Sequence, residues 1–482
     1  MGISLDQSIK DLLSRYPRSL RGRSRTTREM RPLGIDCGMS SSYLPYDPRS
    51  RLLLPPSLDE WLPPDHLSHF ISDTVDHLDL SAFHAAYDLT RRGNQPYHPA
   101  MMVKVLLYAY SSGQFSSRRI ARGLHEDVAL RSLAAGNYPS HRTICDFRQR
   151  HLTDLEGLFV QVVRIARECK LVRLGTIAID GTKIQANASR HKAMSYERML
   201  STEKALKQQI QDLLQRAEAT DCSESDKEEA QTSIPAELAL RQKRLKTIQE
   251  AKARLEARQT EQDQSQGRSE GDDRKSKDKD GRPTGGRYSR DFGVPPEGAQ
   301  ESFTDSDSRI MRHSGGHYEY SYNCQAAVDR ESRMVIGVMV SNCAADAVHL
   351  IPVVDAVEAT MGRQAKTILA DAGYRSEANF QQLESKRISP IIALGREDKA
   401  ASIDTKNLPY TERMRKRMAC AQGRKAYKER KWIVEPVFGW AKRILGFRQM
   451  SMRGLAKAKA EWSLVCTVLN LKRMHVMSAA MA

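Results

Sequence analysis

Residues 175–180 have the sequence GTIAID and residues 367–371 have the sequence TILAD. Each segment is a short aliphatic run that ends on an aspartate, Asp180 or Asp371, followed by small residues. This pattern predicts two buried strands that present a carboxylate at the sheet edge, where the chain turns away. Two such carboxylates on neighbouring strands repel each other unless a cation lies between them. Either aspartate alone would be explained as an ordinary turn former.

The segments around these two strands predict an α/β sheet with flanking helices. Residues 320–329 (YSYNCQAAVD) and 333–342 (RMVIGVMVSN) alternate as two strands of a hairpin with its turn at 330–332. We expect a helix over about 346–361, a short helix opened by Ser376, and a strand in ISPIIAL (388–394). The order is three strands, a helix, a strand, and then further helices.

A third acidic residue, Glu435, lies in the segment YKERKWIVEPVFGWAK, residues 427–442. Tyr427, Lys431, Glu435 and Lys442 are spaced by four, four and seven residues, so we expect them to share one helical face. Pro436 directly after Glu435 predicts a local kink or a helix start. A mixed-charge amphipathic helix with its apolar residues buried is the alternative explanation, and it involves no chemistry.

Three carboxylates without a Ser or Cys triad indicate metal-assisted phosphoryl transfer with two bound ions. Mg²⁺ suits all-oxygen ligands, with Mn²⁺ as the alternative ion. Two histidine-containing pairs, His141 with Cys145 and His313 with His317, have loose spacing and no matching second pair. We interpret them as residues that do not bind metal.

Residues 52–170 predict a helical domain, with one helix starting at Pro99 and a later one within 154–169. Between them we expect two short helices over 116–135 and a new helix from Ser140 in SHRTICDFRQRH (140–151), an arrangement typical of helix-turn-helix DNA binding.

Within this last helix Ser140 is the predicted N-cap, while Ile144 and Phe147 are expected to face the core. The side chains left to meet phosphates or bases are Arg142, Thr143, Arg148 and Arg150. An ordinary basic surface helix is the competing interpretation.

Residues 191–302 interrupt the sheet domain and carry almost no strand pattern. Their first two thirds predict two charged helices that pair with each other. In RSEGDDRKSKDKDG (268–281) ten of fourteen residues are charged, so this stretch is expected to be a disordered linker. Since strands on both sides of the insertion must pair, we expect the chain to leave and re-enter the sheet domain at neighbouring points.

The formal charge of +17 favours a polyanionic partner. The segment from Arg15 to Arg31 contains seven arginines and one acidic residue, which predicts either an arm that follows the DNA backbone or a solvated tail. The eight cysteines form no CxxC pair, and the chain shows neither a signal peptide nor an apolar run of membrane-spanning length. We therefore expect a cytoplasmic protein that is not embedded in a membrane.

The chain resembles transposases of the insertion-sequence 1182 group in four segments that occur in the same order. They are IAIDGTKIQANAS, YNCQAAVD, ILADAGYRS and YKERKWIVEPVFGWAK. The helical N-terminal domain of that group is also similar to two segments of this chain, RRGNQPYHPAMMVKVLLYAYSSG (91–113) and SHRTICDFRQRH (140–151). The resemblance therefore spans nearly residues 50–475. It implies a ribonuclease H-like fold within the wider insertion-sequence four superfamily, with a DDE triad at Asp180, Asp371 and Glu435.

The superfamily's YREK signature implies that Tyr427, an arginine and Lys442 contact DNA beside Glu435. Here the residue four positions before Glu435 is Lys431, whereas the nearest arginine is Arg430. The sequence thus leaves two candidates, Arg430 and Lys431, for the basic residue that contacts phosphate. We favour Arg430, because only arginine makes a planar two-bond contact with phosphate.

The implied organisation has a basic arm (1–50), a helical DNA-binding domain (51–172), a catalytic domain (173–190 and 303–475) and an inserted helical hairpin (191–302) with a linker over 266–300. The implied chemistry is cleavage at the terminal inverted repeats followed by strand transfer into target DNA. The resemblance also implies that the chain acts as a homodimer on DNA, in the bacterial cytoplasm and in association with the nucleoid. The alternatives are a ribonuclease H-like nuclease without strand transfer and an inactive DNA-binding relic.

Overall fold

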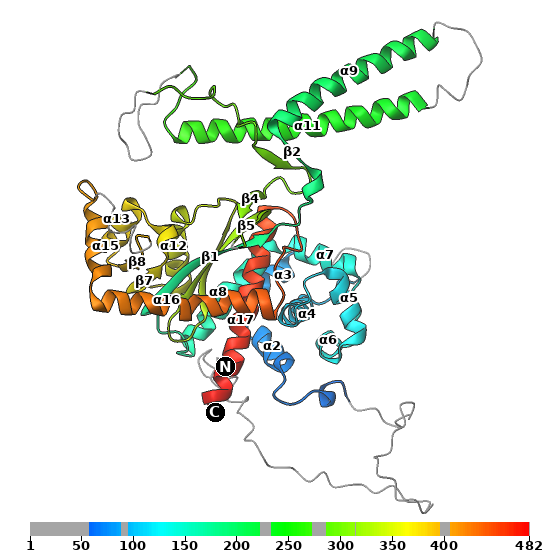
Figure 1. The fold of residues 1–482 in the computed structure, drawn as a ribbon. Coiled ribbons are helices and arrows are strands. Elements are labelled where there is room, and N and C mark those ends of the chain that lie inside the picture. The colour runs from blue at the N-terminus through cyan, green and yellow to red at the C-terminus, as the bar shows by residue number, and fades with distance from the viewer. Residues whose placement is uncertain are drawn as a thin grey trace, which may run out of the picture.

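The computed structural model describes residues 57–87, 95–221, 233–271, 286–313, 315–395 and 405–481. A group of helices from the N-terminal third packs beside a mixed sheet, and a long helical hairpin projects from that sheet (Figure 1). The predicted arm, residues 1–50, lies outside the described residues. Among the described residues, no helix combines the length and hydrophobicity needed to cross a membrane.

The N-terminal helices follow the sequence patterns closely. They are η1 (Asp59–Trp61), α2 (Leu67–Asp76), α3 (Ser81–Ala85), α4 (Pro99–Ser111), α5 (Ser117–Glu126), α6 (Val128–Leu133), α7 (His141–Arg150) and α8 (Leu152–Glu168). Helix α4 begins at Pro99 as predicted, since a helix's first residue needs no N–H partner. The two short helices expected over 116–135 are α5 and α6.

The central sheet contains both antiparallel and parallel strand pairs. Its strands are β1 (Thr176–Gln185), β4 (Arg309–Arg312), β5 (Tyr318–Asp329), β6 (Val335–Ser341), β7 (Thr367–Ala370) and β8 (Ser389–Ile392). β5 pairs antiparallel with β1, β4 and β6, whereas β1 pairs parallel with β7, which pairs parallel with β8. The predicted hairpin is thus β5 with β6.

Strand β1 is longer than predicted. We expected it to end at Asp180, but it continues to Gln185 because β5 pairs with it over its whole second half. Asp180 therefore lies within the strand, opposite Ala326, and not at a sharp turn. Asp371, in contrast, directly follows the last residue of β7, as expected.

Helices from the C-terminal half cover the sheet. They are η3 (Ala347–His349), α12 (Leu350–Met361), η4 (Ala372–Tyr374), α13 (Glu377–Ser385), α15 (Pro409–Ala419), α16 (Ala421–Gly439), the π-helical turn η5 (Trp440–Ile444) and α17 (Leu455–Met481). Pro436 lies inside α16, which does not break there; the irregular turn follows it at η5. A missing proline N–H leaves only one helical hydrogen bond unmade, so α16 can pass through it.

The N-terminal helices and the sheet share one continuous hydrophobic core, which runs from Phe70 to Met474. Helix α17 packs against α4, α8 and β6, so the last helix joins the two predicted domains. Trp462 of α17 is fully buried at their junction, and its Nε1 donates to the carbonyl of Gln325. The domain boundary drawn at residue 172 therefore separates two parts of one packing unit.

The insertion forms the predicted helical hairpin of α9 (Tyr196–Asp221) and α11 (Ser233–Ser265), shown in green in Figure 1. It leaves and re-enters the domain through two short paired strands, β2 (Ala193–Ser195) and β3 (Gln300–Ser302). The exit and return points are therefore adjacent, as the pairing requirement predicted. The two three-residue strands carry no sequence pattern of their own.

The described parts of the linker expected over 266–300 make ordered contacts. Arg268 is buried, donates to the carbonyl of Arg290 at 2.6 Å, and stacks over the ring of Tyr288. The backbone N–H of Gly293 donates to Asp263 of α11. Residues 266–271 and 286–300 thus differ from the expectation of disorder, while residues 272–285 lie outside the described residues.

Candidate active site

Two aspartates lie side by side on neighbouring parallel strands. The ladder between β1 and β7 pairs Ala178 with Leu369, and Asp180 and Asp371 each follow two residues later. Asp180 Oδ1 accepts from the N–H of Gly181 at 2.8 Å, and Asp371 Oδ1 accepts from the N–H of Gly373 at 2.9 Å. The chain thus places both carboxylates at the edge of the sheet where β7 ends, while β1 continues past Asp180.

The environment of Asp180 opposes its negative charge. Burial and the nearby Asp371 raise the pKa of this carboxyl, Arg430 lowers it, and the net result is a pKa of about 6. A half-buried carboxylate beside a second one is costly unless positive charge is supplied. The pair is therefore a donor set of hard oxygens that fits a divalent cation such as Mg²⁺.

Arg430 brings positive charge from helix α16 to this pair. Its Nη1 lies 2.7 Å from Asp180 Oδ2, and its side chain is 9% exposed. The guanidinium also lies 5.9 Å from the ring centre of Tyr427. Lys431, one residue further along, is exposed on the helix surface. Of these two candidate basic residues, it is Arg430 that reaches the aspartates.

Glu435 does not join the two aspartates. Its side chain lies on the exposed side of α16, while the neighbouring Val434 is buried. At 3.6 residues per turn, Arg430 and Glu435 project about 140° apart, so the two side chains leave α16 in different directions. Within the described ranges, no three acidic, His or Cys side chains lie close enough to hold a metal ion.

Lys442 reaches the same edge of the sheet from η5. Its ammonium donates to the carbonyl of Lys183 at 3.0 Å, three residues after Asp180 in β1. Burial lowers the pKa of Lys442, and the nearby cations Arg448 and Lys183 lower it further. Tyr427, Lys431 and Glu435 lie at the predicted four-residue spacing within α16, whereas Lys442 lies in η5. Lys431 and Glu435 are exposed, and the contacts to β1 are made by Arg430 and Lys442.

Behind the aspartates lies a polar cluster that sequence reasoning missed. Asp346, just before η3, accepts hydrogen bonds from Lys183 of β1 and from Asn323 and Gln325 of β5. Asn323 and Gln325 are fully buried in a central strand. Their spacing of two residues in YSYNCQAAVD was the available signal, because it puts two polar side chains on one face of a buried strand.

Helix α7 confirms most of its predicted geometry. Ser140 is the N-cap and accepts from the N–H of Thr143, while Ile144 and Phe147 are buried. Arg142 and Arg150 are exposed, and Arg150 lies over the ring of Tyr87.

Arg148 corrects the predicted DNA-contacting set. Its side chain is 3% exposed, and its guanidinium donates to Glu461 of α17, Tyr110 and Ser451. Glu461 is itself fully buried, so the two charges compensate each other inside the protein. Arg148 is thus a structural residue that ties α7 to α17 and has no surface for phosphate.

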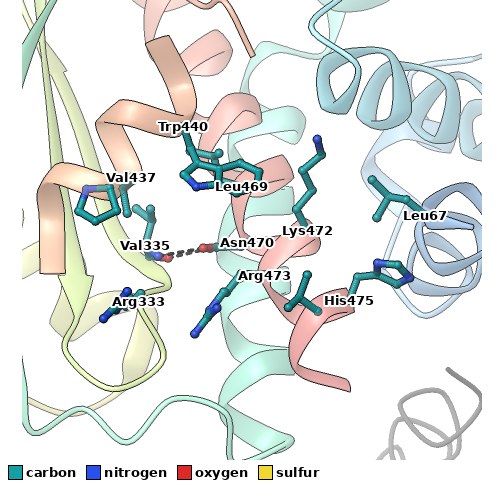
Figure 2. A pocket seen from close by; sticks show the side chains of 12 residues that line it. Leu67, Arg333, Val335, Val437, Trp440, Leu469, Asn470, Lys472, Arg473 and His475 are labelled. Carbon is teal, nitrogen blue, oxygen red and sulfur yellow. Dashed lines mark hydrogen bonds between the residues drawn. The ribbon is translucent and has the colours of Figure 1, made fainter. Parts of the chain in front are cut away.

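A separate pocket of about 400 Å³ lies between the C-terminal half of α16, the β5–β6 turn, α2 and α17 (Figure 2). Apolar side chains such as Val437 and Leu469 line it, with Trp440 above them and Arg333, Lys472 and Arg473 around it. None of its lining residues in the described part of the chain is acidic. The pocket therefore lacks the groups for metal chemistry, and the candidate active site is the aspartate pair.

Two protein-family models match this chain. Residues 289–471 match a transposase DDE domain, and residues 56–150 match a transposase domain known as DUF772. The first range contains Asp371, Arg430 and Glu435 but begins after Asp180, and the second contains all of α7. A DDE domain implies a ribonuclease H-like fold, with which the mixed sheet agrees. No curated protein and no solved structure matched the chain.

Proposed function

The chain belongs to the DDE-type transposases, and we propose that it binds the terminal inverted repeats of an insertion sequence, cleaves DNA there and transfers the freed strand to target DNA. The observation that carries this proposal is the placement of Asp180 in β1 and of Asp371 directly after the adjacent parallel strand β7, in an environment that raises the pKa of Asp180. Carboxylates so arranged are suited to phosphoryl transfer.

Asp180, Asp371 and Glu435 would hold two Mg²⁺ or Mn²⁺ ions, which when bound supply Lewis-acid stabilisation of charge at phosphorus. In this structure the side chain of Glu435 is exposed, and the residue of α16 that contacts Asp180 is Arg430. For Glu435 to join the two aspartates, α16 would have to rotate or shift. DNA can drive that shift by offering Arg430 a phosphate in place of the Asp180 carboxylate.

The basic residues around the pair would hold the DNA backbone at the scissile position. Arg430 offers a planar fork that suits a phosphate, and Lys442 lies beside the carbonyl of Lys183 at the same sheet edge. Tyr427, one turn before Lys431 and in contact with Arg430, would pack against the terminal nucleotide. Lys431 is exposed on the same helix and would make a weaker phosphate contact.

Recognition of the repeats would fall to α7, whose Arg142 and Arg150 are exposed while Ile144 and Phe147 anchor the helix in the core. The formal charge of +17 supports binding to DNA that weakens as salt is added. Coupled joining of two ends requires both to be held together, so we propose a homodimer on DNA, acting at the nucleoid in the cytoplasm.

The test is cleavage of a DNA that carries the element's two ends, in Mg²⁺, by the native chain and by Asp180→Asn, Asp371→Asn and Glu435→Gln. Glu429→Gln is the matched control, because Glu429 is an acid of the same helix that pairs with Arg330 instead of facing the aspartates. We expect each of the three substitutions to abolish cleavage while binding of the ends persists, and the control to cleave normally. Cleavage by all three variants would place the active site elsewhere.

A joining assay with pre-cleaved ends separates the transposase from a nuclease of the same fold. The transposase yields a covalent product between the end and target DNA. Hydrolysis without any joined product would favour the nuclease, and binding without either reaction would favour an inactive relic.

A further inference from the structure

No ladder hydrogen bond holds Asp371 beside Asp180 in the described sheet. The last residue pair between β1 and β7 is Ala178 with Leu369, and β7 ends at Ala370. Asp371 is the N-cap of the short turn η4, which exchanges no strand hydrogen bonds with β1. Some other contact must fix η4 against the sheet, because catalytic ligands have to be held to within a fraction of an ångström.

A chain of side-chain hydrogen bonds runs from β1 to η4. Lys183 Nζ donates to Asp346 Oδ1 at 3.0 Å, and Gln325 Nε2 donates to the same oxygen at 2.9 Å. The other end of the Gln325 amide, Oε1, accepts from the hydroxyl of Tyr374 in η4. Asp346 and Gln325 therefore connect strand β1 to the turn that carries Asp371.

Both ends of this chain are anchored independently. Lys183 also donates to the carbonyl of Ala344 at 3.0 Å, and Asn323 of β5 donates to Asp346 Oδ1 at 2.7 Å. At the other end, Asn379 donates to the carbonyls of Ala347 and Tyr374, at 2.7 and 3.0 Å, and so ties η3 to η4. Tyr374 is fully buried, which makes its single hydroxyl contact costly to lose.

Two glycines show how closely this network fits behind the aspartates. A Cβ at Gly181 would lie 2.9 Å from Asp346 Oδ1 and 2.4 Å from Gln325 Nε2. A Cβ at Gly373 would lie 3.0 Å from Asp371 Oδ1 and 3.4 Å from Asp346 Oδ2. A side chain at Gly181 would thus displace Gln325 and Asp346, and one at Gly373 would press on Asp371 and touch Asp346, so Asp346 lies close to the residues that follow both aspartates.

We propose that Asp346 is a positioning residue of the active site, which acts through Lys183, Gln325 and Tyr374 to fix Asp371 at its distance from Asp180. The inference deepens the proposed function and rests on it for the catalytic role of the two aspartates. Asp346 itself contacts no reacting atom. Its loss leaves Gln325 free to rotate and Tyr374 without a fixed acceptor, so η4 and Asp371 become mobile.

The experiment compares Asp346→Leu and Tyr374→Phe with the native full-length chain. Asp346→Leu keeps the approximate size but removes the acceptor oxygen to which Lys183 and Gln325 donate, and Tyr374→Phe removes only the hydroxyl. Asp355→Asn is the matched control, because Asp355 is an exposed acid on the adjoining α12 that pairs with Lys386. Amide hydrogen exchange of residues 371–374 reports on η4 directly and does not depend on any activity.

We expect both variants to exchange the amide of Gly373, whose N–H donates to Asp371, at least about tenfold faster than the native chain and the control. Cleavage of the DNA ends should fall about 10- to 100-fold with a higher half-saturating Mg²⁺ concentration and unchanged affinity for the ends. A general loss of folding would instead weaken end binding as well.

Native exchange rates at 371–374 in both variants would overturn the proposal, whether or not the chain cleaves DNA. Faster exchange together with full cleavage would also overturn it, since Asp371 would then need no fixed position. Faster exchange in a chain whose native form cleaves nothing would uphold the positioning of Asp371 and refute the proposed function alone.

Discussion

The guanidinium of Arg430 lies 2.7 Å from the carboxylate of Asp180, joining helix α16 to the middle of strand β1. The contact balances the charge of a half-buried carboxylate, and it also holds α16 in the orientation that leaves Glu435 exposed. Arg430 Nε is buried without a hydrogen-bond partner among the described residues. The arginine is thus incompletely satisfied in this arrangement, which favours its transfer to a phosphate when DNA binds.

Arg430→Lys should lower cleavage of the DNA ends about 10- to 100-fold, because lysine keeps the charge but loses the planar two-bond contact. Lys431→Met, on the adjacent exposed position, should change the rate less than about threefold. Single-turnover cleavage with saturating DNA measures both. A larger loss in Lys431→Met than in Arg430→Lys would identify Lys431 as the basic residue of the signature.

The raised pKa of Asp180 predicts a pH-dependent stability in the absence of divalent ions. Because the folded-state pKa is about 6 instead of 3.8, the protonated carboxyl favours folding at low pH, and this contribution is lost as pH rises through 6. The free energy of unfolding of the native chain, minus that of Asp180→Asn, should fall by roughly 2–3 kcal/mol between about pH 4 and pH 7. Urea unfolding across that range measures it. A pH-independent difference would mean that Asp180 titrates normally.

Mg²⁺ should stabilise the folded chain at pH 7.5 by binding between the aspartates. At a free concentration about ten times the dissociation constant, mass action adds roughly 1.4 kcal/mol to the free energy of unfolding. Thermal unfolding with and without Mg²⁺ should show this shift in the native chain and in Glu429→Gln, and EDTA should reverse it. An equal shift in Asp371→Asn would assign the ion to another place.

The Arg148–Glu461 pair should matter for stability and not for DNA sequence. Both side chains are almost fully buried, so Arg148→Met or Glu461→Gln leaves one buried charge uncompensated and should cost about 3–5 kcal/mol of unfolding free energy. Arg142→Ala and Arg150→Ala, at exposed positions of the same helix, should change stability by less than about 0.5 kcal/mol.

The same two exposed substitutions should weaken binding to the terminal repeats more than binding to random DNA, which competition binding measures. Equal losses on both DNAs would reduce Arg142 and Arg150 to phosphate contacts. If chemical denaturation showed that Arg148→Met leaves the free energy of unfolding unchanged, this would contradict the structural role of Arg148.

Local patterns were sufficient to predict most elements. Pro99 marked the start of α4, Ser140 capped α7, and alternation over 320–342 marked the β5–β6 hairpin. The need for pairing across the insertion correctly predicted adjacent exit and return points. Asp180 and Asp371 were identified because a carboxylate after a short aliphatic strand is a local feature, and their strands are indeed neighbours.

By itself, then, the sequence determined most of the helices and strands and identified the two aspartates that follow short aliphatic runs, since these features depend on periodicity and on nearby residues. That the strands of Asp180 and Asp371 are neighbours was decided by the tertiary structure. Only the tertiary structure decided that Arg148 is buried, that Arg430 and not Lys431 reaches Asp180, and that Asp346 lies behind both aspartates. Arg148 pairs with Glu461, Arg430 with Asp180, and Asp346 with Lys183. In each pair the two residues are more than a hundred positions apart in the sequence. A charged residue looks like surface until its partner is known, and only packing brings such partners together.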